Sequence, residues 1–452
     1  MLGALERMSA ETAGTRQLLI ELYDVAVAAA HPRTCLAPHL PPAPKSGRMI
    51  VLSAGKAAMA MASVAEAHYR AAGTLDRLTG VATAPHGYAA AIQGFKAERL
   101  EILEGRHPTP DESSLAAAER ALALARSAGP DDTVLVLLSG GASALWAAPA
   151  AGLTLAEKIA LTRGLLKSGA DIHEMNAVRR HLSRIKGGRL RAAAANAGTF
   201  ITLAISDVPG DDPETIGSGP TVADPTTLVD ACAVIARRSG RMAELGLPVP
   251  PGVSRVLEDN ANETPKPGAK LFARDRYQII ATPVAALDAA CAIAKARGYE
   301  IENLGDRVTG EARDVAAAHA ALARKARAAG RRLAIISGGE LEVTVRNRSG
   351  RGGRSQEYAL ALACALDGLK GVSALAADTD GIDGGEGRVD DPAGAVIGPD
   401  TLSRAAARHL NAQNALDNND ATTLFEALGD LVHTGPTHTN VNDFRVILVE
   451  PA

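Results

Sequence analysis

Short apolar runs of strand length alternate with longer helical segments along this 452-residue chain, and that alternation restricts its fold more than any other feature. Met49–Ala54 and Thr133–Leu138 are nearly continuous apolar runs, as in strands that helices cover on both faces. Because the alternation recurs in both halves, we expect an α/β fold of two Rossmann-like three-layer domains with largely parallel sheets. In such folds ligands bind beyond the carboxyl ends of the strands, so the loops there are the candidates for a site.

The predicted elements are numerous enough for two domains. Expected strands span residues 49–54, 81–83, 100–103, 133–138, 200–205, 277–281, 300–303, 332–337, 341–345, 372–377 and 445–449. Expected helices span residues 12–30, 55–71, 113–128, 155–169, 176–195, 228–238, 284–297, 311–329, 356–366 and 401–409. The chain exceeds what one hydrophobic core usually holds, and residues 247–270 are rich in Pro and polar side chains. We therefore predict an N-terminal α/β domain over 1–246, a linker region over 247–270 and a C-terminal α/β domain over 271–452.

The composition argues against several classes of function. A formal net charge of −3 gives no positive footprint for nucleic acid, and aromatic residues at 3% leave little for base stacking. No run of about 18 apolar residues suggests a membrane span. The cysteines are far apart, as in a protein of a reducing compartment: Cys35, Cys232, Cys291 and Cys364. We expect a cytoplasmic protein without nucleic-acid or membrane partners.

Two loops of the first half follow predicted strands and carry groups suited to phosphate. Lys56 stands where a strand turns into a helix, at a pole that attracts anions, although a lysine there is often only an exposed surface residue. A Walker A loop is excluded because Ile50 occupies the place of its first glycine. Residues 139–141 (Ser-Gly-Gly), with Ser143 nearby, suit a nest of backbone N–H groups for phosphate oxygens, whereas a plain turn needs only one glycine.

Three further stretches of the first half offer cations, a carboxylate and backbone donors. Residues 180–190 crowd cations around a Gly-Gly break, which suits a polyphosphate and equally suits a solvated helix face. Asp207 follows a predicted strand directly, where carboxylates typically hold Mg²⁺. Residues 217–221 offer another group of backbone donors. The nucleotide-binding candidates are Ser139, Gly140, Gly141, Ser143, Lys186, Gly187, Gly217, Ser218 and Gly219.

Polar residues again follow predicted strands in the second half. Arg354 opens a helix, where its planar fork can clamp a carboxylate or stabilise a transferring phosphoryl group. Asp380 belongs to a run of spaced acids that fits either a metal site or a general base. Glu340 follows a strand, and Asn442 lies in a polar loop before the last strand. Both are candidate substrate contacts.

Taken together and in this order, these loops resemble the glycerate 2-kinases that combine a DUF4147 domain with a C-terminal MOFRL domain, relatives of which are sometimes labelled hydroxypyruvate reductase. The resemblance covers nearly the whole chain. It departs at Ser355, where Asn is expected, and at His438, where Gly is commoner. The matching stretches are Gly55-Lys56-Ala57, Arg106-His107-Pro108-Thr109-Pro110, Ser139-Gly140-Gly141, 181–189, 217–224, Gly352-Gly353-Arg354-Ser355-Gln356-Glu357, Thr379-Asp380-Gly381 and 434–443.

This resemblance implies transfer of the ATP γ-phosphoryl group to the 2-hydroxyl of D-glycerate, which gives 2-phospho-D-glycerate and ADP. It also implies an active-site cleft between the domains, with Lys56 and Arg354 catalytic and in contact with the substrate. We add Asp207 as a third catalytic candidate, and Asp207 or Asp380 as the holder of Mg²⁺. The expected cofactors are ATP and Mg²⁺, the expected partner is D-glycerate, and a homodimer is the assembly to test.

Two other functions stay open from the sequence. An NAD(P)H-dependent hydroxypyruvate reductase of the usual kind needs G-x-G-x-x-G between a strand and a helix, and this spacing is absent from the sequence. A non-catalytic sensor of a sugar acid or phosphate also uses Gly-rich loops, but seldom sets Lys, Arg and strand-end acids in opposite halves. The sequence favours the kinase, and it leaves the choice among small hydroxy acids open.

Overall fold

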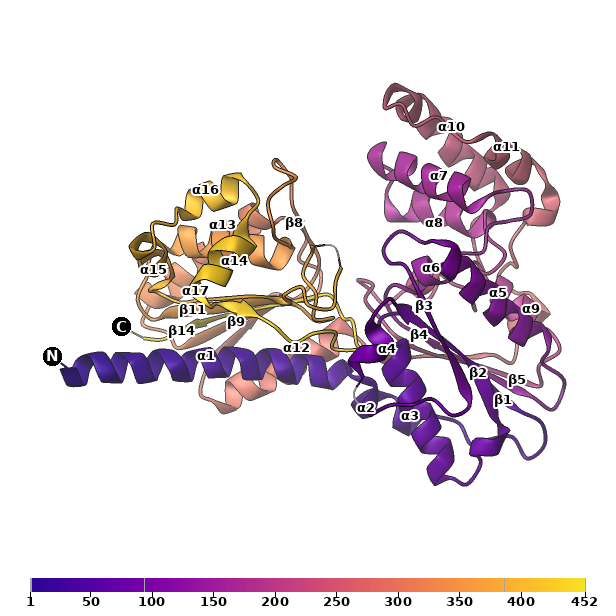
Figure 1. Cartoon of the computed structure of the whole chain (residues 1–452), viewed down its shortest axis with the longest axis horizontal. Coiled ribbons are helices and arrows are strands. Elements are labelled where there is room, and N and C mark those ends of the chain that lie inside the picture. The colour runs from indigo at the N-terminus through magenta and orange to yellow at the C-terminus, as the bar shows by residue number, and fades with distance from the viewer. Residues whose placement is uncertain (1, 93, 386, 452) are drawn as a thin grey trace. The chain divides into compact units, whose positions relative to one another are not determined.

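The computed structural model describes residues 2–92, 94–385 and 387–451, with side chains from Gly14 onward. The chain forms two compact units, each with a sheet of its own (Figure 1). The continuous unit is Cys35–Ile280, and the split unit combines the residues before Cys35 with those from Ala281 onward. These limits differ from the expected domains, because the first helix joins the C-terminal unit and residues 247–270 belong to the continuous unit instead of a linker.

A six-stranded sheet forms the middle of the continuous unit. Its order is β3-β2-β1-β4-β5-β6, and the first four neighbouring pairs are parallel, as predicted. β1 and β4 pair in register from Met49↔Thr133 to Ala54↔Leu138, so the loops that follow them leave the sheet at the same edge. The strands are β1 (Met49–Ala54), β2 (Leu78–Pro85), β3 (Leu100–Gly105), β4 (Thr133–Leu138), β5 (Thr199–Ile205) and β6 (Arg276–Ala281).

Helices cover both faces of this sheet and complete a three-layer arrangement. α3 (Ala58–Ala71) packs on one face, while α5 (Glu112–Arg126), α6 (Ala142–Leu145) and α9 (Arg189–Ala193) pack on the other (Figure 1). α5 begins directly after Asp111, because the Asp111 side chain caps the helix by accepting the Ser113 and Ser114 N–H groups. Two further short helices are α2 (Pro32–Cys35) and α4 (Tyr88–Ala91).

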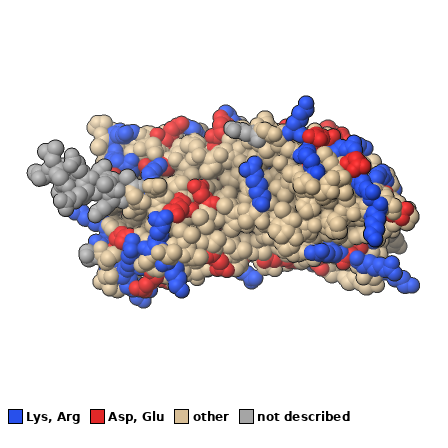
Figure 2. All heavy atoms as spheres, turned by 90° about the horizontal axis from the view of Figure 1, so that it is seen from below, with Lys and Arg blue, Asp and Glu red and all other residues tan. Residues whose placement is uncertain are grey.

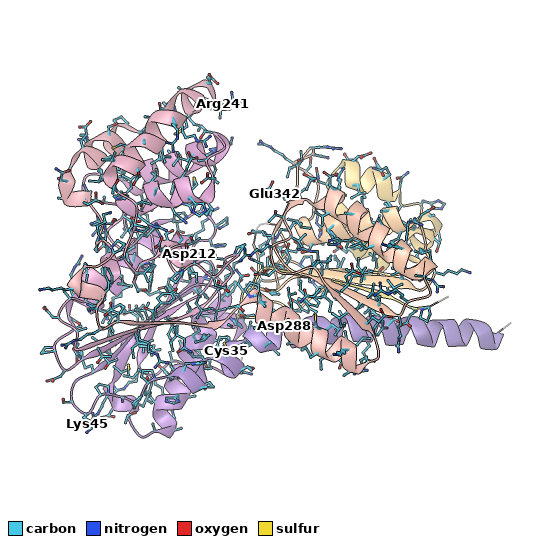
Figure 3. The ribbon with its side chains drawn as sticks, turned by 180° about the vertical axis from the view of Figure 1, so that it is seen from behind. Cys35, Lys45, Asp212, Arg241, Asp288 and Glu342 are labelled. Atoms are coloured by element: carbon cyan, nitrogen blue, oxygen red, sulfur yellow. The ribbon has the colours of Figure 1, made fainter. Side chains whose placement is uncertain are left out.

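Four helices of the continuous unit form a helical lobe with a hydrophobic core of its own (Figure 1). They are α7 (Leu155–Lys167), α8 (Ile172–His181), α10 (Leu228–Glu244) and α11 (Pro251–Glu258). α11 lies inside the stretch expected as a linker, and its Gly252 N–H donates to Glu157 of α7 (3.1 Å). Proline and polar residues there cap and end a packed helix instead of marking a domain boundary. Arg241 marks the outer end of α10 in Figure 3.

The sheet of the split unit is mixed, so the prediction of a largely parallel sheet is wrong here. Its order is β13-β12-β11-β14-β9-β7, in which β9–β7 is parallel and the other four pairs are antiparallel. Strands covered on both faces carry continuous apolar runs in either direction, so the sequence pattern does not reveal strand direction. The strands are β7 (Glu300–Asn303), β9 (Leu333–Ser337), β11 (Val372–Asp378), β12 (Gly394–Ile397), β13 (Leu431–Val432) and β14 (Asp443–Val449), beside a two-stranded pair of β8 (Gly310–Glu311) and β10 (Leu341–Glu342).

Helices cover both faces of the second sheet too. α1 (Leu2–Ala30) and α12 (Pro283–Ala296) pack on one face, while α13 (Ala312–Ala328) and α14 (Arg354–Leu366) pack on the other. The Tyr23 hydroxyl of α1 donates to Asp378 O (2.9 Å), and Leu19 and Leu22 are fully buried. The first helix belongs to this unit because its apolar side covers this sheet. The remaining helices are α15 (Thr401–Ala407), α16 (Ala412–Asp417) and α17 (Ala421–Leu428).

The described surface is mixed in charge, and the four cysteines of the chain are reduced. Figure 2 shows Lys and Arg interspersed with Asp and Glu on one face of the molecule. None of the described helices is long and apolar enough to cross a membrane. Cys35, Cys232, Cys291 and Cys364 are free thiols, and burial raises the pKa of Cys35 to about 12.

Candidate active site

The loops after β1 and β4 are joined by hydrogen bonds at the carboxyl edge of the sheet in the continuous unit. The Lys56 N–H donates to Gly140 O (2.8 Å), and the Ala57 N–H donates to Ser139 Oγ (2.9 Å). Gly55 has a φ of 127°, and a Cβ there would lie 2.1 Å from Ser139 Oγ, so this junction requires glycine. Lys56 therefore lies at the Ser139-Gly140-Gly141 turn, the second phosphate-binding candidate that the sequence offers in this half of the chain.

Two other predicted loops meet at Ser143 of α6. Ser143 Oγ lies 2.9 Å from Ser218 Oγ, and Lys186 Nζ donates to Ser143 O (2.6 Å). The Gly187 N–H donates to Ser218 O (3.1 Å), so it ties these two loops together instead of pointing at open space. Predicted residues separated by about 75 positions along the chain thus form one cluster, which includes Gly217 and Gly219 on either side of Ser218.

A cavity of about 700 Å³ opens beside this cluster, within the continuous unit. Its lining includes Gly141, Ser143 and Lys186, which the sequence predicts, together with Lys158 of α7 and Arg179 of α8, which it misses. A signal for Lys158 was present, because it lies at i−3 and i−7 from the buried Leu161 and Leu165, on the apolar side of its helix. Nothing in the sequence distinguishes Arg179 from the cations that follow it.

The two buried lysines of this cavity are electrostatically unusual. Burial, together with the positive charges of Arg179, Arg184 and Arg189, lowers the pKa of Lys158 to about 7. Burial, together with Lys158 and Arg179, lowers the pKa of Lys186 well below its usual value. Both ammonium groups donate to backbone carbonyls, Lys158 to Leu182 O (2.8 Å) and Lys186 to Ser143 and Trp146 O. A bound anion would compensate this accumulated positive charge.

Asp207 lies directly after β5, next to the edge where the Lys56 loop leaves the sheet. In the same loop, the Asp211 Oδ1 atom is buried and has no hydrogen-bond partner within the described part of the chain. Asp212, labelled in Figure 3, is used internally, since it accepts the Glu214 N–H and the Thr215 hydroxyl. A buried carboxylate oxygen without a donor fits a hard cation, which supports the expectation of Mg²⁺ at this loop.

Arg354 of the split unit is held by three carboxylates. Its guanidinium donates to Asp443 Oδ1 (2.7 Å), Asp378 Oδ2 (2.8 Å) and Glu340 Oε1 (2.7 Å). Burial alone would lower the pKa of Arg354, but the three carboxylates outweigh it and raise that pKa. Asp378 and Asp443 are buried, whereas the Glu340 side chain is 56% exposed. The arm of Arg354 that faces Glu340 is therefore the arm accessible from solvent.

The other predicted residues of the split unit lie in the same cluster. The Asp380 N–H donates to Asp378 Oδ1 (3.1 Å), and Asn442 O accepts both the N–H and the hydroxyl of Thr379. Arg445, which the sequence analysis misses, donates to Asp443 Oδ2 (3.0 Å) and is 1% exposed. A buried arginine two residues after an aspartate in an apolar strand was the available signal.

The structure thus gathers the candidates into two groups. Lys56, the Gly-rich loops, Lys186 and Asp207 lie in the continuous unit, while Arg354, Glu340, Asp380 and Asn442 lie in the split unit. The expectation that both groups act in one cleft stays a prediction.

Comparison with known proteins decides the family. The family described as a domain of unknown function (DUF4147) matches residues 18–258, and the MOFRL family matches residues 333–443. The D-glycerate 2-kinase of Thermotoga maritima is 35% identical over 439 residues, which cover 96% of this chain and 98% of that protein. The chain belongs to the glycerate 2-kinase family.

Other proteins similar to this chain share its architecture, but their names differ. A crystal structure of the Thermotoga maritima glycerate kinase has a TM-score of 0.82 and 33% sequence identity, and covers 97% of this chain and 100% of its own. This similarity confirms the two-domain α/β fold class. A provisionally named hydroxypyruvate reductase of Agrobacterium vitis is 45% identical over 448 residues, which cover 98% of this chain and 96% of that protein.

The two expected departures from the family pattern lie in the split unit. Ser355 stands at the start of α14, and its buried hydroxyl has no hydrogen-bond partner among the residues that the structure describes. His438 is buried in the loop before β14. Its backbone has a φ of 57°, a conformation that explains why glycine is commoner at this position.

Proposed function

We propose that this protein transfers the γ-phosphoryl group of ATP to the 2-hydroxyl of D-glycerate, giving 2-phospho-D-glycerate and ADP. The observation that carries the proposal is the convergence of the Lys56 loop and the Ser139-Gly140-Gly141 turn at one strand edge, beside a cavity lined by cations. Phosphoryl transfer requires positioning and charge stabilisation more than covalent chemistry, and these groups supply both.

Residues of both units take part in the proposed reaction. The Lys56 ammonium stabilises negative charge on the transferring group, and the backbone donors of residues 139–141 hold the phosphates of ATP. Arg354 holds the carboxylate of glycerate through the arm that Glu340 contacts in the absence of substrate. Asn442 contributes to the same substrate site.

The carboxylates of the Asp207 loop fit Mg²⁺, with Asp207 and Asp211 as its ligands and Asp380 as the candidate in the split unit. When bound, Mg²⁺ neutralises charge on the phosphate oxygens of ATP. Asp207 follows β5 in the sheet that also carries the Lys56 loop, and we assign it as the alternative general base that orients the 2-hydroxyl.

A reductase is the second candidate, because the relative with 45% identity carries that name. The sequence lacks the G-x-G-x-x-G turn of the usual dinucleotide site, and the loops at the strand edge carry Lys56 and adjacent serines instead. The kinase is therefore the function we propose.

Parallel assays separate the two candidates. The purified protein is incubated with Mg²⁺-ATP and D-glycerate while ADP release is followed, and separately with NADH or NADPH and hydroxypyruvate while nicotinamide absorbance is followed. The proposal predicts glycerate-dependent ADP release and no oxidation of nicotinamide. The reverse pattern would overturn it.

A further inference from the structure

Two parts of the continuous unit form the walls of its cavity. The loop at residues 107–110 and the helix α6 form one wall, and α7 and α8 of the helical lobe form the other. The lobe has its own hydrophobic core, with Leu161 of α7 and Met175 and Val178 of α8 packed inside it. Because these helices are fixed by that core, they present the side chains on their outer surfaces at defined positions along the cavity.

Positive charge accumulates on this wall without a carboxylate to balance it. Among the described residues, no Asp or Glu lies within ion-pair distance of Lys158, Arg163, Arg179 or Lys186, although the protein forms many ion pairs elsewhere. Lys158 is 7% exposed and Lys186 is 2% exposed. A buried cation is costly unless an anion pairs with it, so this wall is suited to a ligand that carries several negative charges.

The same cavity also offers apolar surface. Ile159 and Leu166 lie on its wall, and Leu166 is 58% exposed, which is unusual for a leucine in a helix that packs against a core. At about 700 Å³ the cavity is in the range of sites for drug-sized molecules, and it is much larger than a three-carbon acid requires. A ligand that combines a polyphosphate with a planar apolar group matches both features.

We propose that this cavity is the nucleotide site, with Lys158 and Arg179 of the helical lobe binding the polyphosphate and Leu166 with Ile159 contacting the base. The inference rests on the proposed function, because it takes ATP as the ligand. It assigns the helical lobe, and not the Gly-rich loops alone, to nucleotide binding. The low pKa of Lys158 is consistent with an amine that a bound phosphate would return to its charged form.

Lys158 also has a structural contact, which the test has to separate from ligand binding. Its Nζ donates to Leu182 O at the end of α8, so a substitution there also affects the lobe. Arg179 is half-buried and has no hydrogen-bond or ion-pair partner among the described residues, so its removal breaks no such contact, although it also relieves the charge that lowers the pKa of Lys158 and Lys186. Lys167, at the exposed end of α7 and outside the cavity, is the matched control.

Equilibrium binding of Mg²⁺-ATP to the full chain, without glycerate, tests the assignment by calorimetry. Lys158→Met and Arg179→Met should each weaken binding about tenfold or more, because each removes a charge-assisted contact to phosphate. Lys167→Met should bind like the wild type. Inorganic tripolyphosphate serves as a second probe. Leu166→Ser should weaken ATP binding about threefold and leave tripolyphosphate binding unchanged, since only the base loses apolar contact.

The outcomes separate this inference from the proposed reaction. If the wild type phosphorylates glycerate but Arg179→Met and Lys158→Met bind ATP normally, the cavity is not the nucleotide site and the kinase function stands. If ATP binding depends on Arg179 but glycerate is not phosphorylated, the site stands and the acceptor is another molecule. Should Lys158→Met prove unfolded by circular dichroism, Arg179→Met and Arg163→Met decide the question.

Discussion

The sequence suggests anion binding for both Lys56 and Arg354, and the structure holds Arg354 in a cluster of carboxylates. Lys56 belongs to a turn whose neighbours are glycine and serine, next to a cavity wall of cations. Arg354 is enclosed by the carboxylates of Asp378, Asp443 and Glu340. Removing Arg354 therefore leaves the buried Asp378 without its cation, although Arg445 still contacts Asp443. This substitution should impair folding as well as activity.

Lys56→Met should lower the turnover number for ADP release by at least about 100-fold, the usual cost of losing one group that stabilises transition-state charge. Urea unfolding of the same variant separates lost activity from lost stability. Lys45→Met, at an exposed lysine labelled in Figure 3, is the control and should retain full activity. Full activity of Lys56→Met would remove Lys56 from the site.

Arg354→Met should abolish activity and also destabilise the protein by about 3 kcal/mol, because the buried Asp378 loses its cation while Asp443 keeps Arg445. Arg354→Lys keeps one positive charge but not the planar fork, so it should be destabilised less and still be inactive. Urea unfolding with ADP-release assays checks both variants. An inactive Arg354→Met of wild-type stability would show that the carboxylate cluster does not depend on this cation.

At the scale of elements, apolar runs and capping residues predict most helices and strands, but not how they assemble. Thr133–Leu138 is a strand as predicted, since six successive buried residues admit few other structures. Gly394–Ile397 is missed, because its strand-forming part is only two residues long, Val396 and Ile397, after a glycine and an alanine. The site shows the same limit. Ser139 and Lys186 are predictable from Gly-rich loops, whereas the approach of α7 to α6 depends on tertiary packing that local sequence does not encode.

The pairing of α13 with α14 includes a buried histidine that should make stability depend on pH. His319 of α13 lies 2.8 Å from the Tyr358 hydroxyl of α14, and burial, then the charge of Arg445, lowers its pKa from 6.5 to about 4. Between about pH 4 and pH 6.5, His319 is protonated in the unfolded chain but not in the folded chain. Stability is therefore complete above about pH 6.5 and is lost as the pH falls towards about 4.

His319→Gln should remove this part of the pH dependence, which amounts to at most about 3 kcal/mol. The glutamine can still accept the Tyr358 hydroxyl. Urea unfolding at pH 5 and pH 8 measures the difference for the wild type, for His319→Gln and for the exposed control His409→Asn. An unchanged pH dependence in His319→Gln would assign the effect to other groups.

At the scale of the whole molecule, the chain order of the units makes a prediction about fragments. Residues 35–280 are continuous and contain a complete sheet, two helical layers and the helical lobe. A fragment of these residues should fold alone and unfold cooperatively. A fragment that starts at residue 281 should not fold, because it lacks α1, whose Tyr23 and Leu22 cover the second sheet. Circular dichroism and urea unfolding of both fragments check this, and a stable fragment from residue 281 would contradict it.

The regiochemistry of the product tests the central claim most directly. Purified protein is incubated with Mg²⁺-ATP and D-glycerate, and the product is identified by ³¹P and ¹H NMR against authentic 2-phosphoglycerate and 3-phosphoglycerate. We expect 2-phosphoglycerate in an amount equal to the ADP released. Formation of 3-phosphoglycerate, or no phosphorylated product while hydroxypyruvate is reduced with NAD(P)H, would contradict it.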